Sequence, residues 1–304
     1  MRDFEKFKGI FPALYACYDD EGNVSPERTK ALVNYYYDKG VRGLYITGSS
    51  GECIYQNKDE RKVAMKAVME AAKGRMVVIA HVAAACTRDS VELAAYAKEL
   101  GVDAIASIPP IYFAFPEYAI ESYWNKMIDA AQLPFFIYNI PQTTGFNMSQ
   151  GLFKKMLENP LVYGVKNTSM PVFDIQQFKS CGGNNCVVFN GPDEQLAGGL
   201  MLGADGGIGG TYGVMPELFL AIYDAMKDGN LERAKAIQFD VSNIIKELTT
   251  MHGHMLSVIK EILRMRGMEI GQAREPLAPV SEEDKPRIVA VEKTINETIA
   301  KYCK

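Results

Sequence analysis

The sequence predicts an α/β protein, namely a (β/α)8 TIM barrel with a C-terminal helical extension. Eight short, mainly apolar runs recur at a spacing of roughly 30 residues, and helical patterns lie between them. The runs are nearly continuously apolar, which is typical of parallel strands that are buried on both faces. An open doubly wound sheet would need a Gly-rich turn after the first strand, and this chain has none there.

Turn and cap signals place the elements along the chain. Ser25-Pro26 supplies an N-cap and a proline for the first helix, Thr87 is the expected cap of the third, and Gly74 and Gly101 end the second and third. The eight predicted strands cover residues 10–18, 43–47, 76–84, 103–108, 134–140, 163–169, 186–190 and 206–211. The predicted barrel helices cover residues 26–40, 58–73, 87–101, 117–131, 149–157, 193–202 and 217–227.

The pattern changes near residue 230, where the strand signals stop. Residues 1–229 are therefore predicted to form the barrel, and residues 230–304 a three-helix segment beside it. The three helices are expected at residues 231–252, 255–266 and 282–302.

Composition points to a small-molecule partner. The 304 residues are 48% hydrophobic, which is enough for a large core, and the net charge is -4 without a basic cluster. These features argue against nucleic acid or an anionic membrane as the main partner. The N-terminus lacks an apolar signal segment, so a cytoplasmic protein is expected. The six cysteines form no CxxC pair and are expected to be reduced structural thiols.

One predicted strand carries a lysine in its middle. In residues 163–169, strand alternation places Gly164, Lys166 and Thr168 on one face. If that face looks into the barrel, the lysine loses much of its water, and desolvation favours the neutral amine that attacks a ketone. The alternative is an outward lysine that extends its ammonium group to solvent at a strand end.

The carboxyl ends of the strands, where such barrels hold their active sites, carry no metal-binding set. A zinc-dependent aldolase needs clustered histidines and carboxylates, whereas His81 stands alone in a strand and His252 and His254 lie far along the tail. Structural roles are expected for all three histidines, and no metal or cofactor is expected. The covalent route remains, in which Lys166 forms an imine with a keto group.

Two further groups fit that chemistry. Tyr138 lies near the end of the preceding predicted strand and, if the two strands are neighbours, could move the proton of the hydroxyl at the cleaved bond. Its alternative is a core tyrosine with a hydrogen-bonded hydroxyl. Ser49 and Ser50, in Gly48-Ser49-Ser50-Gly51, offer hydroxyls and open backbone N–H groups for an α-keto acid carboxylate, although many ordinary turns also contain Gly and Ser.

Several segments together resemble the family of class I aldolases that contains dihydrodipicolinate synthases and N-acetylneuraminate lyases. The segments are Phe11-Pro12-Ala13, Gly48-Ser49-Ser50-Gly51-Glu52, Tyr138-Asn139-Ile140-Pro141, Gly164-Val165-Lys166 and Gly203-Ala204-Asp205-Gly206-Gly207-Ile208-Gly209. The resemblance implies a pyruvate imine on Lys166, Tyr138 as proton shuttle, and Ser49 and Ser50 at the substrate carboxylate. It also implies a homotetramer in which Tyr112 reaches a neighbour's active site.

The lyase branch of this family is the more similar one. The synthases carry an arginine soon after the Asn-Ile-Pro turn, where this chain reads Gln142-Thr143-Thr144-Gly145. The run from Phe189 to Glu194 is similar to the lyase segment that binds the polyhydroxy tail of sialic acid, which implies tail contacts from Gly191, Asp193, Glu194 and Thr168. Gly210 stands where the lyases have a serine.

The expected reaction is the cleavage of N-acetylneuraminate to N-acetylmannosamine and pyruvate. Three alternatives stay open. The first is an aldolase for another 2-keto-3-deoxy sugar acid, such as 2-keto-3-deoxygluconate. The second is a pyruvate condensation like that of dihydrodipicolinate synthase. The third is a sugar-acid sensor without catalysis, because a fold alone does not establish a function.

Overall fold

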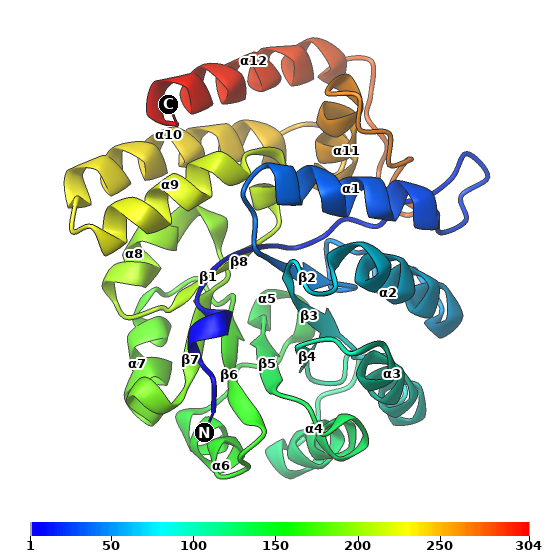
Figure 1. Ribbon diagram of the computed structural model, residues 1–304, viewed down its shortest axis with the longest axis vertical. Helices are drawn as coiled ribbons and strands as arrows, with labels where there is room; N and C mark the ends of the chain where they lie inside the picture. Colours follow the sequence, from blue (N-terminus) through cyan, green and yellow to red (C-terminus); the bar gives the residue numbers. More distant parts are fainter. Residues whose placement is uncertain (1, 304) are drawn as a thin grey trace.

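The computed structural model describes residues 2–303 and shows a parallel eight-stranded barrel surrounded by helices (Figure 1). The strand order is β1-β8-β7-β6-β5-β4-β3-β2, and a parallel bridge between Ala13 and Tyr45 joins the two ends of this series. The strands are β1 (Gly9–Pro12), β2 (Gly43–Ile46), β3 (Val77–His81), β4 (Ala104–Ser107), β5 (Phe135–Asn139), β6 (Val162–Asn167), β7 (Val187–Asn190) and β8 (Gly206–Gly209).

The helices alternate with the strands and then continue past the barrel. The barrel helices are α1 (Pro26–Asp38), α2 (Lys58–Ala72), α3 (Thr87–Leu100), α4 (Glu117–Ala131), α5 (Pro141–Thr144), α6 (Gln150–Leu157), α7 (Phe173–Gly182), α8 (Leu196–Met201) and α9 (Pro216–Lys227). The later helices are α10 (Leu231–Thr249), α11 (Met255–Met265) and α12 (Asp284–Tyr302). Short 3-10 turns are η1 (Glu5–Phe7), η2 (Gly183–Asn185), η3 (Asp193–Gln195) and η4 (Thr211–Val214).

The barrel has two apolar layers. One lies inside the strands and contains Phe11, Tyr45, Phe136 and Phe189, and the other fills the space between strands and helices. Phe7 of η1 closes the amino-terminal end of the interior, where its ring meets that of Phe136 at 5.1 Å. The opposite end, at the carboxyl ends of the strands, is left open for a site.

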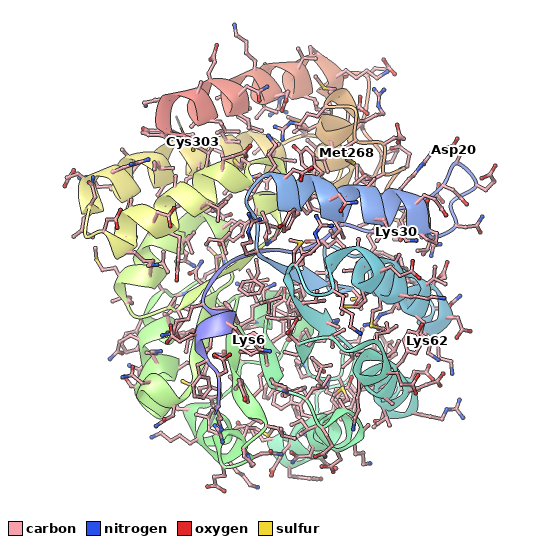
Figure 2. The ribbon with its side chains drawn as sticks, in the orientation of Figure 1. Lys6, Asp20, Lys30, Lys62, Met268 and Cys303 are labelled. Atoms are coloured by element: carbon pink, nitrogen blue, oxygen red, sulfur yellow. The ribbon has the colours of Figure 1, made fainter. Side chains whose placement is uncertain are left out.

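The C-terminal helices form a layer on one side of the barrel. α10 packs against α9, and α12 packs outside α10, as Figure 1 shows. Figure 2 labels Lys30 of α1 and Lys62 of α2 on the outer helices. Lys30 pairs with Glu70 of α2 at 2.5 Å, and Lys62 pairs with Glu92 of α3. No helix within residues 2–303 has the length and apolar character that a membrane crossing requires.

Several predicted boundaries were wrong. β1 ends at Pro12 rather than residue 18, because the backbone beyond it bonds to other segments, as when Tyr18 N–H donates to the Ile270 carbonyl. β8 ends at Gly209, since the N–H of Thr211 donates to a carboxylate instead of a strand. The helix predicted from residue 193 begins as η3 and becomes α-helical only at Leu196.

Two helices were not predicted, and one cap was misplaced. α5 is a single turn, and α7 begins after Val172, which gives no side-chain cap. The cap of α3 is Cys86, whose sulfur accepts from the N–H of Asp89, so Thr87 is already helical. α10 ends at Thr249 rather than residue 252, and α12 begins at Asp284 rather than residue 282.

Candidate active site

A cavity of about 220 Å³ lies at the carboxyl ends of the strands. It brings together nine of the ten predicted site residues: Ser49, Ser50, Tyr138, Lys166, Thr168, Gly191, Asp193, Glu194 and Gly210. Other lining residues include Tyr45 from β2 and Ile245, Thr249 and Met255 from the C-terminal helices. These four residues were not predicted as site residues from the sequence.

Lys166 points into the barrel and is only 5% exposed. Its strand, β6, lies very close to β7 at Gly164. A Cβ added there would lie only 1.8 Å from the Val187 carbonyl oxygen. The lysine Nζ lies 3.9 Å from the ring centroid of Tyr138 and 4.8 Å from that of Tyr45. This placement excludes the alternative of a lysine extended to solvent, and it puts a desolvated amine at the base of the cavity.

Tyr138 is the register partner of Lys166 across the β5–β6 pair. Its ring also meets Tyr45 edge-on at 5.9 Å and His81 at 6.1 Å, so two neighbouring aromatic rings fix its position. The phenol and the amine therefore line one cavity, which is the arrangement that proton transfer beside an imine needs.

His81 has a structural role, as predicted. Its Nδ1 lies 3.1 Å from the Thr47 carbonyl, and its Nε2 accepts the N–H of Ile108 at 3.3 Å. Because a carbonyl can only accept, the proton sits on Nδ1. Burial, helped by the nearby Arg61 cation, lowers the pKa of His81 well below its usual value. The neutral ring thus ties together the ends of β2, β3 and β4.

The loop that carries the two serines follows β2, and we call residues 48–52 the serine loop. Its N–H groups close it on itself, since Glu52 donates to the Ser49 carbonyl and Cys53 donates to the Gly48 carbonyl. Only glycine fits well at position 51, where a Cβ would lie 3.0 Å from the Thr47 Cα. Ser50 is buried and Ser49 is exposed, and both line the cavity.

Asp193 lies on η3 and is buried against β8. One carboxylate oxygen accepts both the N–H of Thr211 at 2.7 Å and its hydroxyl at 2.6 Å. Burial raises the pKa of Asp193 to about 6, although the two bonds from Thr211 act in the opposite direction. Glu194 beside it is exposed, so the pair offers one buried and one open carboxylate to the cavity.

The remaining predicted site residues in the cavity shape its wall. Gly191 lies so close to Thr168 that a Cβ would meet the threonine hydroxyl at 2.0 Å, and that buried hydroxyl has no hydrogen-bond partner within residues 2–303. At Gly210 a Cβ would lie 3.3 Å from the Ser50 hydroxyl and 3.7 Å from the Met255 methyl group. A side chain at position 210 would therefore face the cavity, but the Ser50 hydroxyl would have to move by a few tenths of an ångström to admit it.

Tyr112 is the predicted site residue that does not line this cavity. It is 92% exposed and its φ of 81° is left-handed, which is strained for a bulky side chain. Neighbouring Phe113 is also exposed. In residues 2–303, no three His, Cys, Asp or Glu side chains come together as a metal site would need.

Several known proteins are similar in sequence to this chain. Residues 6–295 match the Dihydrodipicolinate synthetase family. The chain is 53% identical to the N-acetylneuraminate lyase of Mediterraneibacter gnavus over 286 residues, which cover 93% of this chain and 91% of that protein. It is 32% identical to the N-acetylneuraminate lyase of Rhizobium meliloti, with 92% of each chain covered.

Several solved structures have the same fold as this chain. The wild-type sialic acid aldolase of Ruminococcus gnavus superposes with a TM-score of 0.96 at 50% identity, covering 98% of this chain and 99% of that one. A catalytic lysine mutant of that aldolase superposes with a TM-score of 0.98 at 50% identity, covering 99% and 100%. A Clostridium difficile protein in complex with mannosamine superposes with a TM-score of 0.89 at 29% identity, covering 99% and 100%.

Proposed function

Because this chain belongs to the Dihydrodipicolinate synthetase family, we propose that it is a class I aldolase that cleaves N-acetylneuraminate to N-acetylmannosamine and pyruvate. The observation that carries the proposal is the desolvated Lys166 amine beside the Tyr138 ring at the base of the cavity. The relatives named N-acetylneuraminate lyase and sialic acid aldolase support the choice of substrate.

The reaction begins when the Lys166 amine attacks the keto carbon of the open-chain sugar acid and water leaves, which gives a protonated imine. Tyr138 takes the proton of the hydroxyl on the carbon beyond the bond to be cleaved. That hydroxyl becomes an aldehyde as the carbon-carbon bond breaks, and its electrons pass to the imine to form an enamine. The enamine then gains a proton and is hydrolysed, which releases pyruvate and restores the amine.

The other lining residues bind the two ends of the substrate. Ser49 and Ser50 hold the carboxylate with hydroxyl and backbone N–H groups. Asp193 and Glu194 accept hydrogen bonds from the hydroxyls of the tail, and each carboxylate can accept more than one. Thr168 has a buried hydroxyl at the same wall, and Gly191 leaves the space for it.

The experiment that tests the substrate is a side-by-side turnover assay with N-acetylneuraminate and 2-keto-3-deoxygluconate. We expect a higher kcat/KM for N-acetylneuraminate, because the shorter acid leaves part of the Asp193–Glu194 wall unused. A clear preference for the shorter acid would contradict the proposal. Binding of N-acetylneuraminate without turnover would instead support the sensor.

We also propose a homotetramer in which Tyr112 contacts the active site of a neighbouring copy. The strained, exposed Tyr112 supports this, since such a backbone conformation persists where function requires it. A second cavity of about 430 Å³ shares Ser49 and Ser50 with the first, and its wall includes the exposed Ile54 and Tyr55. An aromatic side chain from a second copy would cover this apolar surface next to the site.

A further inference from the structure

The serine loop is connected to the C-terminal helices by a buried ion pair. Glu52, the last residue of the loop, places a carboxylate oxygen 2.7 Å from Nζ of Lys260 on α11. The two side chains are 0% and 1% exposed. Charged side chains are rarely buried to this extent, and a buried pair is weak evidence of a gain in stability. A gain in stability therefore does not by itself explain why this ion pair is buried at this position.

The pair belongs to a network that comes entirely from outside the barrel strands. The second Glu52 oxygen accepts the backbone N–H of Arg274 at 2.9 Å and the hydroxyl of Tyr18 at 3.3 Å. Lys260 also donates to the Gln272 carbonyl at 3.1 Å. Burial lowers the pKa of Lys260, while the Glu52 charge opposes that effect. Three separate groups thus hold one carboxylate.

The backbone makes the serine loop sensitive to that carboxylate. Glu52 has a left-handed φ of 53°, a conformation that non-glycine residues keep only when their surroundings impose it. Its N–H bonds to the Ser49 carbonyl, so the side chain that Lys260 holds and the serine that faces the cavity belong to one tight turn. Movement of the Glu52 carboxylate would therefore move Ser49 and Ser50.

The other end of the loop is held in a similar way. Thr47 also has a φ of 53°, and its hydroxyl donates to the His81 carbonyl at 2.8 Å. The buried Arg61 donates to the same carbonyl at 2.6 Å and to the Ala83 carbonyl at 2.5 Å. The barrel thus fixes the start of the loop, and α11 fixes its end.

α11 is itself held in a fixed position, so it can support the serine loop. Asp284 accepts the N–H groups of His252 at 2.9 Å and Gly253 at 2.8 Å, which fixes the turn before the helix. Burial acts to raise the pKa of Asp284, but hydrogen bonds from Ser281, His252 and Gly253 outweigh it and hold the pKa far below its usual value. Met255, the first residue of α11, lines the active-site cavity.

We propose that the Glu52–Lys260 pair is a positioning device that sets Ser49 and Ser50 for the carboxylate of the keto acid. The C-terminal segment is then a working part of the active site as well as a layer of packing. This inference rests on the proposed function, because it assumes that the keto acid forms an imine with Lys166 and that the serine loop holds its carboxylate.

The test compares imine formation with two ketones. Pyruvate carries the carboxylate, whereas acetone has a methyl group in its place. Borohydride trapping, read by mass spectrometry of the intact protein, gives the concentration of each ketone that labels half of the protein. The variants are Lys260→Met and the double variant Glu52→Gln with Lys260→Met. Lys179→Met is the matched control, because it removes the partly buried Lys179–Asp205 pair, which does not contact the serine loop.

We expect Lys260→Met to raise the half-labelling concentration of pyruvate at least about tenfold, the effect of losing one charge-assisted contact, and that of acetone less than about twofold. The double variant removes the unpaired buried carboxylate and should regain thermal stability while the pyruvate value stays high. It also serves as the test variant if Lys260→Met does not fold. The Lys179→Met control should change neither the half-labelling concentration of pyruvate nor that of acetone.

Two results would overturn the inference alone. One is an unchanged pyruvate value in a folded variant, and the other is an equal rise for pyruvate and acetone, which would indicate a general structural effect. A wild-type protein that pyruvate does not label at any concentration would overturn the proposed function, and the positioning role with it. The two failures are therefore distinguishable in one data set.

Discussion

The Nζ atom of Lys166 lies 3.9 Å from the centroid of the Tyr138 ring, and the two residues are direct partners across β5 and β6. The amine is buried, and the ring faces of Tyr138 and Tyr45 beside it attract positive charge. A protonated imine formed on this lysine would therefore be stabilised by both rings.

Tyr138→Phe should lower kcat by about 10²- to 10⁴-fold, the usual contribution of a positioned acid or base. The phenyl ring keeps the contacts with Lys166, Tyr45 and His81, so imine formation should persist. Steady-state kinetics and borohydride trapping on the same sample separate the two effects. Near wild-type turnover by a folded variant would show that another group moves the proton.

Binding of the sugar-acid tail should depend on pH through Asp193. Burial raises its pKa to about 6, so its proton is bound more tightly in the folded state than in the unfolded state. The stabilising contribution of this group is therefore lost as the pH rises through about 6. The carboxylate that accepts substrate hydroxyls forms over the same range.

We expect KM for N-acetylneuraminate to fall as the pH rises through about 6 and to be pH-independent over that range in Asp193→Asn. The loss of a hydrogen bond to a charged group predicts a KM roughly tenfold higher in that variant at neutral pH. Initial rates at several pH values provide the measurement. If the variant keeps the pH dependence of the wild type, a different group is responsible.

Gly210→Ser should place a hydroxyl in the cavity at the cost of a small shift of the Ser50 hydroxyl. The backbone there has an ordinary φ of -77°, and the nearest atoms leave a Cβ 3.3 Å from the Ser50 hydroxyl. A new hydrogen bond contributes about 0.5–1.5 kcal/mol, so KM for N-acetylneuraminate should fall by roughly two- to tenfold. Half-labelling by pyruvate, which has no tail, is the control. A higher KM for the sugar acid would mean that the tail does not reach this wall.

Tyr112→Gly should weaken the assembly and lower activity, although it relieves a strained backbone. Sedimentation should show smaller species than the wild type, and kcat/KM should recover in part at high protein concentration. Val289→Ser is a suitable control, because Val289 is an exposed apolar residue on α12, away from the cavity. An intact tetramer with full activity in Tyr112→Gly would contradict the role of this side chain.

The sequence was sufficient for the barrel because its strands are apolar runs and its helices have clear ends. The sequence was insufficient where an element or its end depends on contacts between distant residues or lacks a capping residue. α7 has no side-chain cap and was missed, and β8 stops at Gly209 because of a bond between Thr211 and Asp193 that no local pattern reveals.

The site could be predicted to the extent that its residues sit at strand ends. Lys166 and Tyr138 follow from strand alternation and from the resemblance of their motifs to a known family. The buried role of Arg61 could not be predicted, because a buried charged residue within α2 is indistinguishable in sequence from one on the solvent face of that helix. Glu52 and Lys260 are far apart along the chain, so only the fold brings them together.

The most direct test of the central claim is borohydride reduction of the protein with pyruvate, followed by peptide mass spectrometry. We expect one stable adduct, located on Lys166, that forms in wild type and in Tyr138→Phe and is absent from Lys166→Met. An unlabelled wild-type protein, under conditions that label a known class I aldolase, would contradict it. So would an adduct that persists in Lys166→Met.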